Sequence, residues 1–233
     1  MKAVAVIPAR GGSQRIPRKN IKNFHGKPII AYSIQTALNS GCFDRVIVST
    51  DDEEIADIAR EFGADVPFLR GARFADHFAT TGQVMAHVIE QLAEQGCNPE
   101  LFCCLYATAP LLKVDDLCKG QSLIQEPGID YVFCATSFAF PVQRAVRINN
   151  TQLAAMVNPE NMLVRSQDLE PLYHDAGQFY WGKRSAFLEQ RPFFAGRSKA
   201  VVVPRQRVQD IDTEEDWQFA QLLFSALQAN HAK

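Results

Sequence analysis

The sequence lacks the features of a membrane protein or an exported one. No apolar run reaches the roughly 18 residues that a membrane-spanning helix needs, and the apolar run near the start, residues 3–7, is too short for a signal peptide. We therefore expect a cytoplasmic protein with no membrane partner. Internal repeats and low-complexity tracts are also missing, which argues against collagen-like and coiled-coil classes.

An excess of charge is missing as well. The 233 residues include 24 basic and 26 acidic side chains, for a formal net charge of −2. This balance gives no overall attraction to nucleic acid, although a local basic pocket remains compatible with it. None of the six cysteines belongs to a Cys-x-x-Cys pair or a zinc-ligand spacing. We expect reduced, mostly buried thiols; a catalytic cysteine is the less favoured alternative.

What the chain does contain is an alternation of strand and helix patterns. Short apolar or β-branched runs alternate with segments of helical spacing, which predicts one α/β domain over residues 1–233. The expected architecture has three layers, with a doubly wound, mostly parallel sheet between helices. Strands are expected at 3–7, 45–49, 101–106, 131–136, 178–181 and 199–203, and helices at 28–38, 51–62, 81–94, 114–124 and 214–228, the last capped by Thr213.

Residues 138–171 interrupt this alternation. The segment has short alternating pieces and no strong helical pattern, and Asn149-Asn150 is typical of a hairpin turn. We expect a small β-hairpin insertion that contacts a second copy of the chain in a homodimer and lies near the substrate site.

A basic, glycine-containing loop follows the first expected strand. It holds Arg10, Arg15, Arg18 and Lys19, with glycines and Ser13 between them. In open α/β sheets ligands bind beyond the carboxyl ends of strands, and glycine amides with basic side chains suit phosphate groups. The loop matches neither the Walker A motif nor the dinucleotide fingerprint. A solvated basic loop is the alternative.

A pair of carboxylates, Asp210 and Asp212, lies between the last expected strand and the last helix. Residues two apart in an extended chain project the same way, which would allow joint binding of a hard divalent cation together with phosphates. Acids at a helix N-terminus are the alternative explanation. Asp51 and Asp52 have the same ambiguity, and there we favour helix capping.

These motifs together resemble the acylneuraminate cytidylyltransferases, which use CTP to activate acidic nine-carbon sugars. The resemblance rests on Ala9-Arg-Gly-Gly-Ser-x-Arg-Ile-Pro-x-Lys-Asn20, Gly26-Lys-Pro, Ser49-Thr-Asp-Asp-Glu-Glu-Ile-Ala, Arg70, Thr80-Thr81, Thr108-Ala-Pro-Leu and Asp210-Ile-Asp-Thr-Glu-Glu-Asp-Trp. It covers most of the chain. It implies the nucleotide-diphospho-sugar transferase type of fold.

The resemblance also implies roles for individual residues. Arg10, Lys19 and Asp212 would be catalytic, and Asp210 and Asp212 would bind Mg²⁺. The implied nucleotide-binding residues are Ala9, Arg10, Gly11, Ser13, Lys19, Asn20, Arg70 and Thr81, and the implied sugar-facing residues are Tyr106, His174, Asp175, Gln178 and Tyr180. The sugar's anomeric hydroxyl would attack the α-phosphorus of CTP in line, with no covalent enzyme intermediate.

The implied substrate is pseudaminic acid, because residues 173–181 resemble the branch of the family that activates this sugar. Tyr106 also stands where sialic-acid enzymes tend to have glutamine. Synthesis of CMP-N-acetylneuraminate, or of the nucleotide of another nonulosonate or of 3-deoxy-manno-octulosonate, is the alternative with the same chemistry. A nucleotide-binding regulatory protein without activity is the alternative of another class, although the presence of Arg10, Lys19, Asp210 and Asp212 argues against it.

Overall fold

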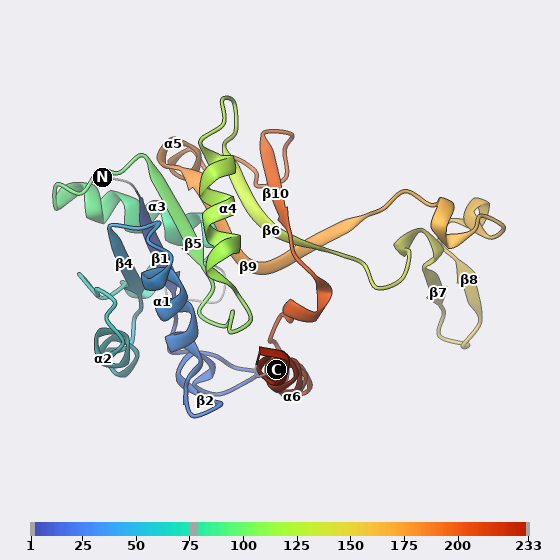
Figure 1. Cartoon of the computed structure of the whole chain (residues 1–233), viewed down its shortest axis with the longest axis horizontal. Coiled ribbons are helices and arrows are strands. Elements are labelled where there is room, and N and C mark those ends of the chain that lie inside the picture. The colour runs from blue at the N-terminus through green and yellow to red at the C-terminus, as the bar shows by residue number, and fades with distance from the viewer. Residues whose placement is uncertain (1–2, 75–78, 232–233) are drawn as a thin grey trace.

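The computed structural model describes residues 3–74 and 79–231. Within these residues the chain forms a layered α/β domain with a long arm projecting from one side (Figure 1). The strands are β1 (Val4–Pro8), β2 (Asn23–Phe24), β3 (Lys27–Pro28), β4 (Arg45–Ser49), β5 (Leu101–Leu105), β6 (Tyr131–Ser137), β7 (Val146–Ile148), β8 (Ala154–Met156), β9 (Tyr173–Lys183) and β10 (Ser198–Val202). The α-helices are α1 (Ile29–Asn39), α2 (Glu53–Glu61), α3 (Thr81–Glu94), α4 (Val114–Ile124), α5 (Arg184–Leu188) and α6 (Glu214–His231).

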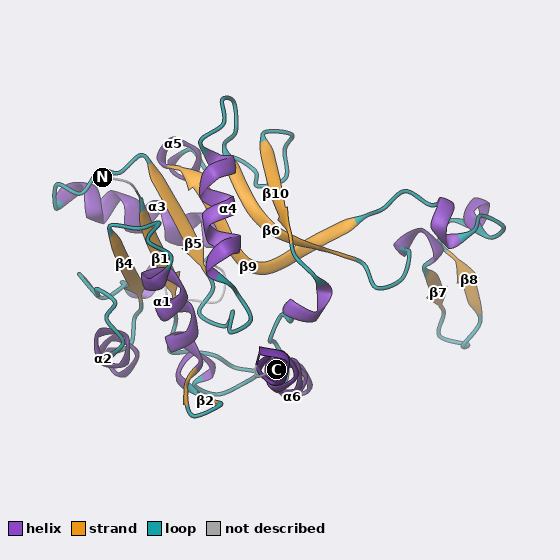
Figure 2. Ribbon diagram, viewed as in Figure 1, coloured by secondary structure: helices purple, strands orange, loops and turns teal. Residues whose placement is uncertain are grey.

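The main sheet has the order β10-β6-β9-β5-β1-β4 (Figure 2). β1 pairs in parallel with β4 and β5, and β10 pairs in parallel with β6. The mostly parallel sheet that the sequence predicts is therefore confirmed. β9 is antiparallel to both β5 and β6, which the run of apolar residues did not indicate. Its direction follows from the arm, because the chain leaves the sheet at the end of β6 and returns along β9.

Helices cover both faces of the sheet, as expected. Alternate strand residues point to opposite faces, and on β1 the side chains of Ala5 and Ile7 pack toward α1, α2 and α4. Those of Val4 and Val6 pack toward α3 and α5. Because both faces are buried, the strands are apolar at nearly every position, and this explains why their positions could be predicted closely.

A third, smaller apolar cluster ties the two ends of the chain together. It contains Ile16 of the basic loop, Phe24 of β2, Ile211, and Trp217 of α6, all nearly or fully buried. The ring of Phe24 meets the ring of Trp217 edge to face at 5.5 Å. This cluster fixes the basic loop against the segment that carries Asp210 and Asp212.

The arm is the predicted insertion. β7 and β8 form an antiparallel hairpin that pairs Val146 with Met156 and Ile148 with Ala154. The side chain of Asn149 accepts hydrogen bonds from the backbone N–H groups of Thr151 and Leu153, each at 3.0 Å, and so stabilises the turn. The hairpin and its position are confirmed. Figure 1 shows that it lies well away from the sheet.

The cysteines also agree with expectation. All six are thiols, and five of them are buried. Burial raises the pKa of the Cys103 and Cys104 thiols, which disfavours the reactive thiolate form. In the part of the chain that the structure describes, no helix has the length and apolar character to cross a bilayer.

Candidate active site

A cleft of about 320 Å³ lies beyond the carboxyl ends of β1 and β5, where the sheet rule places a ligand. Eight of the residues to which the resemblance gave a role in the site line it: Arg10, Ser13, Lys19, Asn20, Arg70, Thr81, Tyr106 and Asp212. They come from parts of the chain that are far apart in the sequence. We call this the basic cleft, because Arg10, Arg15, Lys19 and Arg70 all contribute to its lining.

The first loop owes its shape to main-chain contacts. The Ala9 N–H donates to Ser49 O at 2.9 Å, and the buried Asn20 side chain donates to Arg10 O at 3.0 Å. The Gly11 N–H donates to Asp51 Oδ1 at 3.0 Å. A Cβ atom on Gly11 would lie 2.6 Å from an oxygen of Asp52, so no larger residue fits there without a shift.

Two of the expected nucleotide-binding residues therefore do not line the cleft with their own atoms. Ala9 packs its side chain into the core, and Gly11 faces the acids at the start of α2. Their contribution is to the backbone course of the loop. Asp52 caps α2, as predicted, by accepting from the Ile55 N–H at 3.0 Å.

Arg70 is the most buried cation of the basic cleft. Its residue is 5% exposed, and its Nε lacks a hydrogen-bond partner among the described residues. Asp51 Oδ1 lies 3.8 Å from its guanidinium. Burial lowers the pKa of Arg70. A buried donor without a partner is costly, and an anionic group in the cleft would supply the missing acceptor.

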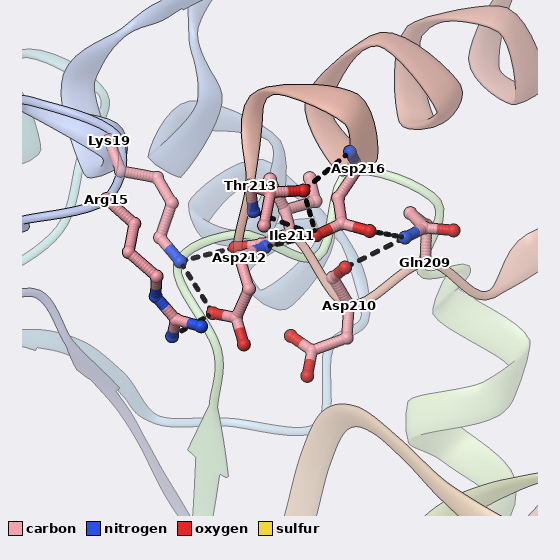
Figure 3. Close-up of polar contacts among 8 residues, drawn as sticks. All are labelled: Arg15, Lys19, Gln209, Asp210, Ile211, Asp212, Thr213 and Asp216. Atoms are coloured by element: carbon pink, nitrogen blue, oxygen red, sulfur yellow. Dashed lines mark hydrogen bonds and ion pairs between the residues drawn. The ribbon is translucent and has the colours of Figure 1, made fainter. Parts of the chain in front are cut away.

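The acidic pair lies just before α6, and of its two members Asp212 lines the basic cleft whereas Asp210 is not among the lining residues. Figure 3 shows the carboxylates of Asp210 and Asp212 on the same side of the loop, as predicted. Arg15 pairs with Asp212 Oδ1 at 2.7 Å, while Lys19 lies 3.5 Å from the same oxygen and donates to Ile211 O. The resemblance implies that Asp212 binds a metal. What the structure shows is that Asp212 contacts two cations of the basic loop.

The end of this loop is fixed by a helix cap. Thr213 Oγ1 accepts from the Asp216 N–H at 3.2 Å, which confirms the predicted cap. Asp216 in turn accepts from the N–H groups of Asp212 and Thr213 at 3.1 and 2.8 Å (Figure 3). These hydrogen bonds fix the backbone of residues 212 and 213 to the first turn of α6.

The repulsion between the carboxylates of Asp210 and Asp212 is one feature that a divalent cation would relieve. Loss of water around the Asp210 carboxylate, followed by the negative charge of Asp212, raises the pKa of Asp210. A cation near this pair would relieve the repulsion. Within residues 3–74 and 79–231, no three His, Cys, Asp or Glu side chains are grouped to hold a metal. Two carboxylates therefore form only part of a coordination shell.

A second cleft, of about 370 Å³, adjoins the first and shares Thr81 and Tyr106 with it. Its other lining residues are Thr80, Gly82, Tyr131, Tyr180, Gln190, Arg191, Pro192 and Phe193. We call it the aromatic cleft. Residues 190–193 form one wall of it, and they belong to the loop of residues 189–197, which the sequence analysis did not single out. Pro192, Phe193 and Phe194 were the sequence feature from which an apolar wall here could have been predicted.

Tyr106 stands at the boundary between the two clefts. Its hydroxyl lies 3.2 Å from Thr81 Oγ1, and its ring centroid lies 5.8 Å from that of Tyr180. Burial raises the pKa of Tyr106 to about 12, so this hydroxyl stays protonated near neutral pH. Tyr180 donates to Asp175. The structure thus brings three of the expected sugar-facing residues to one place.

The other two expected sugar-facing residues lie elsewhere. Gln178 is 3% exposed; its amide donates to Arg207 O at 2.6 Å, and its oxygen accepts from the Cys134 thiol. It lines neither cleft, and its amide holds the carbonyl of Arg207, so the expected sugar contact stays a prediction. His174 is exposed near the root of the arm, where its ring packs on Phe138 at 4.9 Å.

Comparison with known proteins identifies the family. The family profile described as "Cytidylyltransferase" matches residues 4–229. The chain belongs to the cytidylyltransferase family. The family resemblance that the sequence motifs indicated is therefore confirmed, and with it the nucleotidyltransferase class of the enzyme.

Several relatives of this cytidylyltransferase are known. A pseudaminic acid cytidylyltransferase of Campylobacter jejuni is 46% identical over 96% of this chain and 97% of its own. A CMP-N,N'-diacetyllegionaminic acid synthase of Legionella pneumophila is 31% identical over 96% of each chain. The solved structure of a CMP:2-keto-3-deoxy-manno-octonic acid synthetase complexed with CTP shares the fold, with a TM-score of 0.72 at 21% identity over 97% of this chain and 99% of that one.

Proposed function

We propose that this cytidylyltransferase joins CTP and pseudaminic acid to give CMP-pseudaminic acid and diphosphate. The observation that carries the proposal is the pair of adjoining clefts, one basic and one aromatic, that meet at Tyr106. The likeness to the pseudaminic acid enzyme of Campylobacter jejuni supports the choice of sugar. The basic cleft would take CTP and the aromatic cleft would take the sugar.

In the basic cleft, the cations would neutralise the triphosphate. Arg70 offers a buried guanidinium with an unmet donor, and Lys19 and Arg10 reach the same space from the first loop. Charge-assisted hydrogen bonds to phosphate are strong and directional. Ser13, Asn20 and Thr81 add polar groups to the lining, of which Asn20 also fixes the loop through Arg10 O.

A magnesium ion is the expected cofactor. Asp210 and Asp212 would hold it, with phosphate oxygens of CTP completing the shell, because Mg²⁺ takes a few carboxylates together with substrate phosphates. When bound, it would neutralise charge on the phosphates and on the leaving diphosphate. Arg15 and Lys19, which now contact Asp212, lie where they could also contact those phosphates.

The chain's own part in the reaction is alignment. The sugar's anomeric hydroxyl would lose its proton to solvent, and its oxygen would form a bond to the α-phosphorus while the bond from that phosphorus to diphosphate breaks on the opposite side. Lys19 and Arg10 would stabilise the charge that builds on the phosphoryl oxygens. No covalent enzyme intermediate is needed, which agrees with the buried, protonated state of the Cys103 and Cys104 thiols.

The aromatic cleft suits a sugar with an apolar end. Tyr131, Tyr180, Pro192 and Phe193 supply an apolar wall, whereas Tyr106 and Thr81 supply hydroxyl groups at the boundary with the basic cleft. Such a wall favours a substrate with fewer hydroxyl groups, because a polar chain placed there would lose hydrogen bonds with water.

The arm would make a homodimer contact. It exposes large apolar side chains, among them Phe140 at 83% and Leu163 at 93%. Apolar side chains gathered on a projecting arm are typical of a protein interface. The structure shows a cavity of about 330 Å³ at its root, lined by residues 137–139, 141–143, 166–167 and 169–172. One domain with a dimerising insertion remains our interpretation of the chain, and its cytoplasmic location remains a prediction.

The experiment that tests the function is diphosphate release from CTP and Mg²⁺ with a panel of acidic sugars. Pseudaminic acid should give the highest kcat/KM, ahead of N-acetylneuraminic, diacetyllegionaminic and 3-deoxy-manno-octulosonic acids. Higher activity with another of these sugars would replace the substrate and leave the reaction class intact. Absence of diphosphate release with all of them would favour the regulatory alternative.

A further inference from the structure

One wall of the aromatic cleft is formed by residues 190–193, which belong to a loop of irregular structure, residues 189–197, between α5 and β10. Within it Phe193 packs its ring against Tyr131 at 4.6 Å and Tyr180 at 4.8 Å, and Pro192 lies beside it in the lining. A loop without regular hydrogen bonding needs other contacts to hold such a wall in place. The position of these rings sets the width of the cleft.

Asp130, immediately before β6, supplies those contacts. It is 3% exposed, and its two carboxylate oxygens hold the two ends of the loop separately. Oδ1 accepts from Arg191 at 2.9 Å, and Oδ2 pairs with Arg197 Nε at 2.9 Å. The main chain repeats the attachment at one end, since the Asp130 N–H donates to Arg197 O at 2.8 Å. Asp130 O accepts from the Lys183 N–H at 3.0 Å, which fixes Asp130 itself to the end of β9.

We propose that Asp130 is a positioning residue for the sugar cleft: through Arg191 and Arg197 it fixes the wall that carries Pro192 and Phe193. The inference rests on the proposed function, in which the aromatic cleft takes the sugar. Asp130 itself lines neither cleft. Its effect on the reaction is therefore indirect, and it should alter sugar binding while leaving the basic cleft unchanged.

The negative charge of Asp130 explains why an uncharged residue would hold Arg191 and Arg197 less well. A buried carboxylate with two guanidinium partners makes charge-assisted hydrogen bonds in two fixed directions. Asparagine has one acceptor oxygen in place of two, so one guanidinium would face an NH₂ donor and would lose its charge-assisted hydrogen bond. One end of the loop would then be held by its main-chain hydrogen bonds without the side-chain contact to residue 130.

The test compares Asp130→Asn with wild type. We expect the KM for sugar to rise about tenfold while the KM for CTP stays within about twofold, since a displaced wall removes binding to one substrate only. Hydrogen exchange of residues 189–197 should become faster, with exchange of β1 and β5 unchanged. A general loss of fold would instead lower kcat for the whole preparation and leave both KM values as they were.

A second variant tests the same role if Asp130→Asn fails to fold. Arg197→Gln removes one partner that is more than half exposed and lies outside both clefts, so its sugar KM and its loop exchange should move in the same direction by a smaller factor. Asp57→Asn, which breaks an exposed ion pair with Arg60 on α2, is the matched control and should change neither.

The outcomes separate this inference from the proposed function. If wild type releases diphosphate with none of the sugars, the proposed function fails, and loop exchange alone decides the role of Asp130. If wild type is active and Asp130→Asn keeps its sugar KM, or if loop exchange is unchanged in that variant, the positioning role is overturned.

Discussion

Arg18 and Asp52 face each other across the base of the basic loop in a two-pronged ion pair. One guanidinium nitrogen of Arg18 donates to Asp52 Oδ2 and the other to Asp52 Oδ1 at 3.0 Å. Arg18 has a φ of 54°, a left-handed conformation that costs a residue with a side chain about 1 kcal/mol. The ion pair offsets this cost and fixes the turn that leads into Lys19.

We therefore expect Asp52→Asn to weaken CTP binding. Asparagine still caps a helix well, so the variant isolates the loss of the ion pair with Arg18. The KM for CTP should rise about tenfold and the free energy of unfolding should fall by about 1 kcal/mol, because the pair is partly exposed. Steady-state kinetics and urea unfolding measure the two effects. An unchanged KM for CTP would contradict the anchoring role of Asp52.

The same ion pair predicts how this stability depends on pH. The hydrogen bond from Arg18 holds the pKa of the Asp52 carboxyl below its ordinary value of 3.8. A lowered folded-state pKa gives a contribution that is complete above the unfolded pKa and is lost as pH falls through the folded one. The stability difference between wild type and Asp52→Asn should be constant above about pH 5 and should shrink below pH 3.8. Equilibrium unfolding at several pH values checks this, and a difference that grows in acid would refute it.

Arg70 should be needed for CTP specifically. Because its buried Nε lacks a protein partner among the described residues, Arg70→Lys keeps a charge but loses the fork that could meet a phosphate. We expect transition-state stabilisation to fall by about 2–4 kcal/mol, as obtained from the ratio of kcat/KM for CTP in wild type and variant. Arg60→Lys, on the exposed face of α2, is the control. Near wild-type turnover in Arg70→Lys would mean that the cleft binds its anion elsewhere.

Asp212→Ala should abolish Mg²⁺-dependent activity with the fold retained. Asp212 lies between Arg15 and Lys19, so its loss removes a proposed metal ligand and also releases two cations of the loop. We expect turnover to fall by at least about 100-fold. Diphosphate release over a range of Mg²⁺ concentrations measures the effect, and circular dichroism confirms the fold. A variant that keeps wild-type turnover in Mg²⁺ would remove Asp212 from the metal assignment.

Tyr106→Gln should shift the choice of sugar. Glutamine can both donate and accept hydrogen bonds and lacks the ring that now packs near Tyr180. Preference should move toward N-acetylneuraminic acid in a competition with pseudaminic acid at equal concentration and limiting CTP. The ratio of the two CMP-sugar products gives the result. An unaltered ratio would show that Tyr106 does not set specificity.

The arm should control the oligomeric state. Phe140→Asp combined with Leu163→Asp places charge on its two most exposed apolar side chains, and we expect the dimer to dissociate into monomers. Leu222→Asp, an exposed position on α6, is the matched control and should stay dimeric. Sedimentation velocity distinguishes the species. A wild-type chain that sediments as a monomer at working concentration would overturn the dimer itself.

Much of the fold could be predicted from the sequence because its strands are buried on both faces. Such strands are apolar at nearly every position, and β4 and α4 begin and end where the residue pattern places them. The antiparallel direction of β9 could not be predicted in this way. Strand direction is not encoded in an apolar run; it depends on the path by which the chain returns from the arm.

For the site, the sequence by itself determined the chemistry of two separate segments: a basic loop after the first strand and a pair of carboxylates before the last helix. Their residue types and spacing require only local information. Tertiary structure alone decided that they meet, through the apolar cluster of Ile16, Ile211 and Trp217. It also decided that Gln178 is buried and that Asp130 holds a loop far from it in the sequence. Burial and ion pairing depend on which parts of the chain the fold brings together.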